Sequence, residues 1–231
     1  MESPDRPRDR SKDGSRHVTD ERFNTASHLA AAIFALLGTV VLIVMSSVEG
    51  KPWHIVSFAV YGASLVTLFI ASTLHHGIVG TPRVEELLRS LDYHAIFLLI
   101  AGTFTPMCLV VLRGPLGWSV FGVSWAVAVA GIALKAFSSR VPKWVFLTMY
   151  ATMGWLGAAV AWPLTSFVDW SGLALLALGG LLYTGGAVVF ALERPNPIPG
   201  RFGFHEIWHV FVVLGAAAHY FLMLHHVLPL P

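Results

Sequence analysis

The sequence predicts an all-α integral membrane protein with seven transmembrane helices, and both its composition and its apolar runs support this prediction. The chain has 231 residues, of which 55% are hydrophobic and 12% charged. A soluble domain carries about 25% charged residues, roughly twice this share. The apolar residues also form long blocks instead of amphipathic stripes. Blocks of about 20 apolar residues indicate helices that cross a bilayer.

The first 20 residues differ from the rest of the chain because they are polar and rich in Arg, Asp and Ser. They lack the apolar core that defines a signal peptide. Low hydrophobicity with many charges is typical of a disordered segment. We therefore expect a disordered cytoplasmic tail over residues 1–20, followed by a single transmembrane domain over residues 21–231.

Seven apolar segments follow the tail, and each is near the length needed to span a bilayer. They cover residues 26–47, 53–75, 92–112, 116–136, 143–163, 171–192 and 204–228. Pro106 in the third segment and Pro163 at the end of the fifth can each kink a helix. The glycine pairs 179–180 and 185–186 in the sixth predict close packing against another helix. Cys108, the single cysteine, excludes an intramolecular disulfide and is expected to be buried.

The distribution of basic residues predicts the orientation of this bundle. Thirteen of the 15 Lys and Arg residues lie in the tail or in the loops at the same end of the bundle. Only Lys51 and Arg113 lie at the other end. Because basic residues accumulate on the cytoplasmic side, we expect a cytoplasmic N-terminus and an outside C-terminus.

Polar residues of the types found in metal sites gather at the cytoplasmic end of the predicted bundle. His205 and His209 open the last segment, and their spacing of four places both imidazoles on one helix face. His76 closes the second segment at the same end. The other candidates there are Ser72 in the second segment, Asp92 at the start of the third, and Glu21, Asn24 and His28 at the start of the first.

Three imidazoles and one water molecule match the ligand set of a tetrahedral catalytic zinc site. His76, His205 and His209 are therefore the predicted metal ligands. Ser72 and Asp92 are predicted to hold the bound water by hydrogen bonds. Zinc lowers the pKa of its water to about 7, which yields a hydroxide nucleophile at neutral pH. A site at membrane depth favours acyl substrates such as lipid amides or esters.

Each of these residues also has a structural interpretation. A histidine in a membrane helix often forms a hydrogen bond to a neighbouring helix. Ser72 can bond to a carbonyl of its own helix, and Asp92 can cap the start of the third helix.

Three further histidines are expected to lie away from the site. His75 is predicted to face away from His76 and to lie at the membrane interface. His225 and His226 are predicted to lie on the surface at the outer end. His219 lies deeper in the seventh segment, where a packed polar contact is one interpretation, and its role is left open.

Four motifs, taken in order, resemble those of a known family. They are Glu21-x-x-Asn24-x-x-x-His28, Ser72-Thr73-Leu74-His75-His76, Leu91-Asp92 followed by Ile100-Ala101-Gly102-Thr103-Phe104-Thr105-Pro106, and His205-Glu206-Ile207-Trp208-His209. With these motifs, the chain after about residue 20 resembles the haemolysin III family, the bacterial branch of the progestin and adipoQ receptor (adiponectin receptor) proteins. One departure is Tyr93 directly after Asp92, where the family often has a histidine; His94 follows one residue later.

The resemblance implies a bacterial inner-membrane protein that carries zinc on His76, His205 and His209, with Ser72 and Asp92 in the outer shell. Related receptors are regarded as ceramidase-like hydrolases, whereas bacterial members are linked to haemolysis or membrane homeostasis. Membrane lipids are the implied partners, including a lipid amide or ester as substrate, and no nucleic acid is expected.

Three other functions remain open from the sequence. His205-Glu206-x-x-His209 also spells a metalloprotease signature in which Glu206 is the general base. Alternatively, zinc can clamp the second, third and seventh segments in a structural or sensing role. His205 and His219, 14 residues apart, permit a haem, although no second helix offers a matching pair. The substrate, the oligomeric state and the roles of the remaining polar residues, Glu21, Asn24, His28, Glu206 and His219, are left open.

Overall fold

A computed structural model describes residues 12, 14–15, 17–137 and 141–231 of the chain, and within these residues it is helical. The described chain contains seven α-helices in the order α1 (Glu21–Val48), α2 (Pro52–Gly77), α3 (Pro82–Pro106), α4 (Pro115–Phe137), α5 (Lys143–Leu164), α6 (Trp170–Leu192) and α7 (Phe204–Leu222). Two short π-helices, η1 (Met107–Val111) and η2 (Met223–Val227), extend α3 and α7. The described residues form no strand, only an isolated bridge between Ile198 and Phe202.

Six helices in the described part of the chain are long and apolar enough to cross a membrane. These are α1, α2, α3 with η1, α4, α6, and α7 with η2. The remaining helix, α5, is not among the six, so the seventh crossing predicted over residues 143–163 stays a prediction. The cytoplasmic location of the N-terminus also stays a prediction. The helical membrane fold itself is confirmed.

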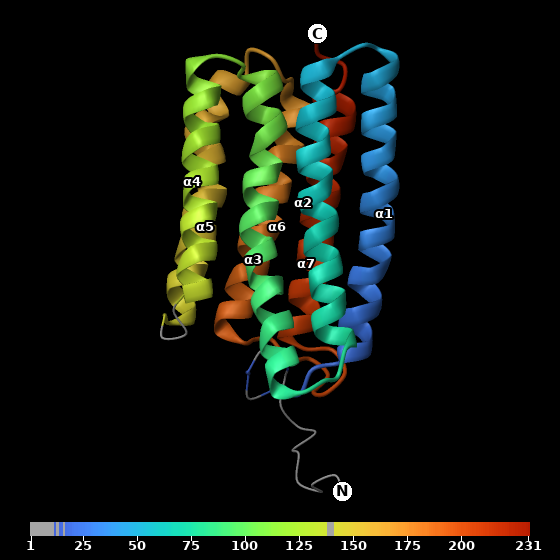
Figure 1. Cartoon of the computed structure of the whole chain (residues 1–231), viewed down its shortest axis with the longest axis vertical. Helices are drawn as coiled ribbons and strands as arrows, with labels where there is room; N and C mark the ends of the chain where they lie inside the picture. The colour runs from blue at the N-terminus through green and yellow to red at the C-terminus, as the bar shows by residue number, and fades with distance from the viewer. Residues whose placement is uncertain (1–11, 13, 16, 138–140) are drawn as a thin grey trace, which may run out of the picture.

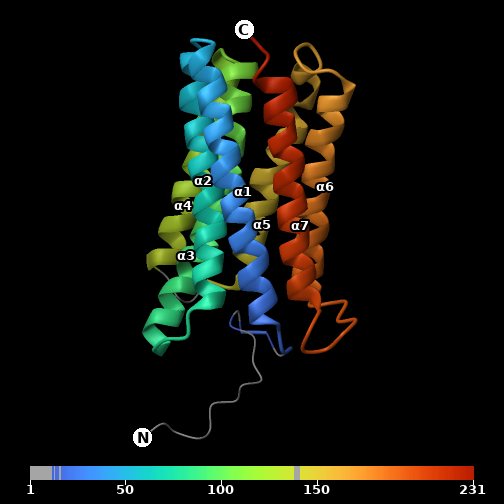
Figure 2. The same ribbon diagram turned by 90° about the vertical axis from the view of Figure 1, so that its right-hand side faces the viewer.

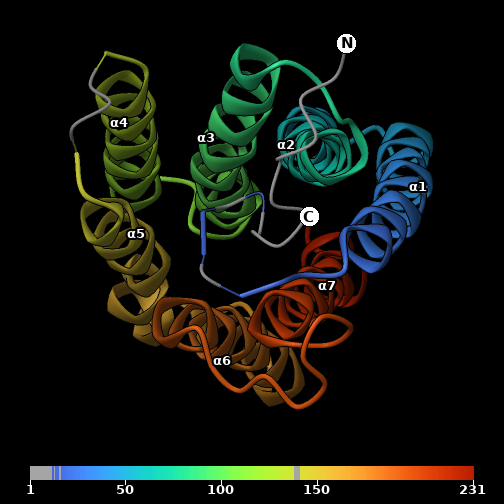
Figure 3. The same cartoon turned by 90° about the horizontal axis from the view of Figure 1, so that it is seen from below.

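The helices run up and down beside one another (Figure 1) and form a ring when seen from below (Figure 3). Consecutive helices are neighbours around this ring, and α7 closes it by packing against α1. Figure 2 shows α1 and α7 side by side. As a result, the first turns of α1 and α7 and the last turns of α2 lie at the same end of the bundle.

Proline and acidic residues account for several helix ends. Asp20 caps α1 by accepting hydrogen bonds from the backbone N–H groups of Arg22 and Phe23. Pro52 and Pro82 begin α2 and α3, where a missing N–H costs nothing. At Pro106, the α-helical ladder of α3 changes into the π-helix η1, as expected where proline removes a donor.

Glycines allow α6 and α7 to pack closely, as the sequence predicts. A Cβ atom at Gly179 would overlap the ring of His219 on α7, and one at Gly186 would lie 2.8 Å from Cβ of Phe211. Gly180, by contrast, has open space around its Cα. His219 is buried in this contact, and its Nε2 lies 3.2 Å from the carbonyl oxygen of Leu176. The sequence leaves the role of His219 open, and the structure shows it in a packed polar contact.

The segment before α1 contacts the end of the bundle. Lys12 Nζ donates hydrogen bonds to the carbonyl oxygens of His75, His76 and Ile78, at 3.1, 2.9 and 2.7 Å. A cation at these last carbonyls of α2 stabilises the negative end of the helix dipole. The disordered tail predicted over residues 1–20 falls largely outside the described residues, whereas Lys12, His17 and Asp20 contact the bundle.

Candidate metal centre

Three buried histidines from two helices meet at the end of the bundle where α1 begins. His76 lies in the last turn of α2, and His205 and His209 lie in the first turns of α7. One ring nitrogen from each of the three lies within 4.8 Å of the others. Nε2 of His76 is 3.3 Å from Nε2 of His205. The structure thus brings together the three residues predicted as ligands, in an arrangement that can hold a metal ion.

Glu21 fixes the ring of His76 from the other side. Its Oε2 lies 2.6 Å from Nδ1 of His76, and its Oε1 accepts a hydrogen bond from the Thr19 hydroxyl at 2.6 Å. A carboxylate at Nδ1 favours the tautomer that carries the proton there, so the lone pair of Nε2 faces the cluster. Metal-binding histidines usually donate their other N–H group to a carboxylate, a backbone carbonyl or water, and such a partner orients the ring and raises its basicity.

His209 shows that the histidine cluster fits a metal. Its Nδ1 is buried and has no hydrogen-bond partner among the described residues. Burial of a polar nitrogen without a partner is costly, and coordination of a metal ion removes this cost. Three neutral imidazoles are a suitable ligand set for zinc.

His28 of α1 lies directly against this cluster. Its ring stacks on that of His209, with 3.8 Å between centroids and 24° between planes. The edge of Phe69 packs on it at 5.1 Å. Both ring nitrogens of His28 are buried and lack a hydrogen-bond partner in the described chain. The structure therefore shows that His28 packs against a candidate metal ligand, a contact that the sequence does not reveal.

Glu206 is fully buried, and both of its carboxylate oxygens are engaged. Oε1 accepts from the backbone N–H of Asp20 at 2.7 Å and from Nδ2 of Asn24 at 3.2 Å. Oε2 accepts from the backbone N–H of Gly203 at 2.7 Å, which caps α7. Glu206 therefore links three parts of the chain by hydrogen bonds: the segment that precedes α1, the helix α1 itself, and the start of α7. A general base needs an oxygen available to a substrate water, so this geometry disfavours the metalloprotease interpretation.

The face of α1 toward the site carries Glu21, Asn24 and His28, spaced three and four residues apart, as neighbours on one helix face must be. Each contacts a different member of the site: His76, Glu206 and His209, respectively.

His75 corrects an expectation drawn from the sequence. It was predicted to face away from His76 toward the membrane interface, but it is only 3% exposed and its ring centroid lies 4.7 Å from that of His76. The reason is that α2 packs between α1 and α3, so adjacent faces of its last turn are both covered.

Asp92 and Ser72, the two predicted partners of a bound water, lie on α3 and α2 respectively. A carboxylate oxygen of Asp92 lies within 4.8 Å of ring nitrogens of both His75 and His76. Asp92 does not cap α3, because α3 begins ten residues earlier, at Pro82. Ser72 is buried one turn before His76 on α2.

Residues 16–220 match the profile of the family described as Haemolysin-III related. The chain belongs to this family. It is 40% identical to hemolysin-3 of Bacillus cereus over 212 residues, which is 92% of this chain and 94% of that protein. It is 34% identical to the hemolysin-3 homolog of Bacillus subtilis, over 93% of this chain and 97% of the relative.

A more distant relative is the monocyte to macrophage differentiation factor of Homo sapiens, 32% identical over 86% of this chain and 80% of that protein. A comparison with solved structures finds none that matches the chain.

In this haemolysin III-related protein, then, a cluster of histidines lies at one end of a bundle of apolar helices, and the carboxylates of Glu21 and Asp92 both lie near His76. The sequence suffices to find the histidines because their spacing and depth are visible in it. It does not reveal that Glu21 pairs with His76 or that Glu206 is a structural clamp, since both facts depend on contacts between distant segments.

Proposed function

We propose that this haemolysin III-related protein is a zinc-dependent hydrolase that cleaves amide or ester bonds of lipids in the bacterial inner membrane. The proposal depends chiefly on the cluster of His76, His205 and His209, whose ring nitrogens lie within 4.8 Å of one another at the end of a membrane bundle. Three histidines as the protein ligands of zinc, with the fourth position open, are typical of a catalytic site. The N-terminal end of the bundle faces the cytoplasm in this proposal.

The three histidines would hold the zinc ion, which supplies Lewis-acid chemistry and a water of lowered pKa. Glu21 holds His76 in one orientation through the 2.6 Å contact to Nδ1. The carboxylate of Asp92 lies within 4.8 Å of ring nitrogens of His75 and His76, and in this proposal it accepts a proton from the attacking water. Ser72 adds a buried hydroxyl on the same helix as His76.

The nature of the surrounding helices supports a lipid as substrate. Six helices are apolar enough to lie in a bilayer, and the cluster lies within the last turns of α2 and the first turns of α7. In this proposal the acyl chain stays in the membrane and its carbonyl group is attacked at the histidines. The relatives named hemolysin-3 are consistent with an activity exerted on membranes.

A structural or sensing metal is the second candidate, and one observation favours it. The cluster joins α2 to α7, which are far apart in the sequence, so a metal ion there would lock the bundle. A structural metal and a hydrolytic metal would use the same ligands, so only a measurement of lipid cleavage distinguishes the two functions.

The hydrolase proposal is tested by the substitution Asp92→Asn. We expect the metal-loaded wild-type protein to release fatty acid from a ceramide or another lipid amide or ester. Loss of the Asp92 carboxylate should lower kcat by about 10²–10⁴-fold, a typical contribution of a general base, while the metal content stays unchanged. Fatty acid release by the purified protein in detergent is the measurement.

Asp169→Asn is the matched control, because Asp169 caps α6 at the other end of the bundle and is exposed. It should leave turnover unchanged. If the metal-loaded wild-type protein cleaves none of these lipids, the hydrolase proposal is contradicted and the structural or sensing metal is favoured.

A further inference from the structure

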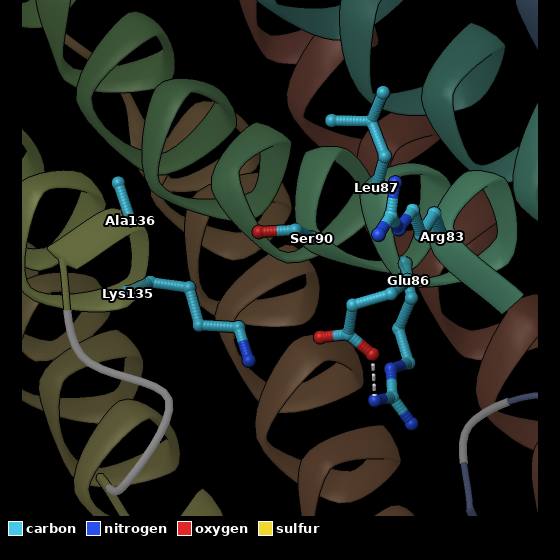
Figure 4. Close-up of a pocket in the computed structure, with 7 residues that line it drawn as sticks. Arg83, Glu86, Leu87, Ser90, Lys135 and Ala136 are labelled. Carbon is cyan, nitrogen blue, oxygen red and sulfur yellow. Dashed lines mark hydrogen bonds and ion pairs between the residues drawn. The ribbon is translucent and has the colours of Figure 1, made fainter.

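A second polar site lies between the beginning of α3 and the end of α4, and it shares no residue with the histidine cluster. It is a pocket of about 400 Å³ lined by Arg83, Glu86, Leu87, Arg89, Ser90, Lys135 and Ala136. Figure 4 shows the Ser90 hydroxyl, the Glu86 carboxylate and the Lys135 ammonium group all directed into the space between the two helices.

The charge of this pocket is positive. Three of its lining residues are cations, namely Arg83, Arg89 and Lys135, and Glu86 is the single carboxylate among them. Glu86 forms an ion pair with Arg89, three residues along α3. The carboxylate is thus largely neutralised within α3, which leaves the charges of Arg83 and Lys135 in excess.

Lys135 is held in place by aromatic rings. Its Nζ lies 5.1 Å from the ring centroid of Tyr93 on α3 and 5.5 Å from that of Phe146 on α5. Such cation–π contacts keep an ammonium group in place without removing its charge. The pocket therefore holds an ordered cation that remains available to an anion.

The pocket lies where the apolar part of the bundle ends. Lys135 lies in the last turn of α4, which is one of the six apolar helices. Leu87 lines the pocket and is 58% exposed. An occupant of this pocket consequently meets three cations and a hydroxyl together with the apolar side chains of Leu87 and Ala136, close to the ends of the apolar helices.

We propose that this pocket binds the phosphate group of an anionic membrane phospholipid. Arginine matches phosphate oxygens with two parallel N–H donors, and lysine adds a point charge. Ser90 supplies a hydroxyl donor, and Leu87 and Ala136 contact the adjoining apolar part of the lipid. Basic pockets between membrane helices are known to suit anionic lipid head groups. This inference is independent of the hydrolase proposal.

The test is lipid retention by the full-length protein, measured by native mass spectrometry after release from nanodiscs that contain equal amounts of phosphatidylglycerol and phosphatidylcholine. We expect phosphatidylglycerol to be retained selectively. Arg83→Gln and Lys135→Gln should each weaken that retention roughly fivefold, the effect of one basic residue near an anionic lipid. Arg201→Gln is the matched control. Arg201 is an exposed cation at the same end of the helix bundle as the pocket, but it does not line the pocket.

Equal retention of the two lipids, or loss of selectivity in the Arg201 control to the same extent, would overturn the proposal.

A competition with inorganic phosphate at matched ionic strength distinguishes the source of the phosphate group. Failure of phosphate to displace the lipid supports a lipid site, and full displacement at equal concentration would assign the pocket to free phosphate and overturn the lipid as its occupant. Unchanged melting temperatures of the variants exclude unfolding as the cause of any loss.

Discussion

At the residue scale, the site depends on how each histidine ring is held, and His76 is the clearest case. One ring nitrogen lies 2.6 Å from Glu21 and the other lies 3.3 Å from His205. The ring is therefore fixed between a carboxylate on α1 and a candidate ligand on α7. This pairing explains why a glutamate at the start of α1 is part of the site although it is not itself a predicted ligand.

The substitution Glu21→Gln tests this role. Without the negative charge at Nδ1, the ring of His76 becomes less basic and loses its fixed orientation, so zinc affinity should fall about 10–100-fold. Competition with a chromogenic chelator measures the affinity. Glu49→Gln is the control, since Glu49 follows the other end of α1 and pairs with Lys51; equal affinities of wild type and Glu21→Gln would exclude a positioning role.

Single residues also show where prediction from sequence reaches its limit. The ligand-type residues are recognisable because two histidines four apart share a helix face and the ends of the apolar segments give their depth. The burial of His75 cannot be recognised in the sequence, because it depends on the helices that pack beside α2. The hydrogen bonds of Glu206 cannot be recognised either, because two of their donors lie in α1 and in the segment before it. Glu206 in particular has a local motif that predicts a catalytic base, whereas the structure uses both of its oxygens to join chain segments.

At the scale of helices, the apolar segments predict the cores of the helices well and their ends less well. The third segment is predicted to begin at residue 92, but α3 begins at Pro82. Its first turns carry the charged residues Arg83, Glu86 and Arg89, which are exposed or partly exposed. Hydropathy does not indicate these turns because it detects only the apolar part of a helix, not a polar extension beyond the membrane. That extension forms one wall of the basic pocket.

Close packing of α6 on α7 gives a prediction for stability. In Gly179→Ala, the new Cβ would overlap the ring of His219, and overpacking of this kind typically costs about 1–3 kcal/mol. We expect a lower melting temperature in detergent than for the wild type.

The neighbouring substitution Gly180→Ala is the matched control, because nothing lies within 4 Å of a Cβ there. It should be neutral or slightly stabilising, since alanine is the better helix former. Equal melting temperatures of the two variants would show that the α6–α7 contact is looser than described.

At the scale of the whole molecule, the order of the helices around the ring explains why the site is formed from the two ends of the sequence. The contact of α7 with α1 brings residues near position 24 beside residues near position 206, and α2 lies next to α1. Depth in the membrane can be predicted from sequence, so the sequence suggests which residues share an end of the bundle. It cannot show which helices are neighbours, because that depends on packing across the ring.

The central claim is that this end of the bundle binds zinc through His76, His205 and His209. Its most direct test is the metal content of the purified full-length protein by mass spectrometry, compared with the triple variant His76→Ala/His205→Ala/His209→Ala. His54→Ala is the control, because His54 is equally buried but lies at the other end, where its Nε2 is 3.1 Å from the carbonyl oxygen of Val227. We predict about one zinc ion per chain in the wild type and in the control, the number that one three-histidine site binds, and almost none in the triple variant. A folded wild type without zinc, or a triple variant that keeps the full amount, would contradict the site.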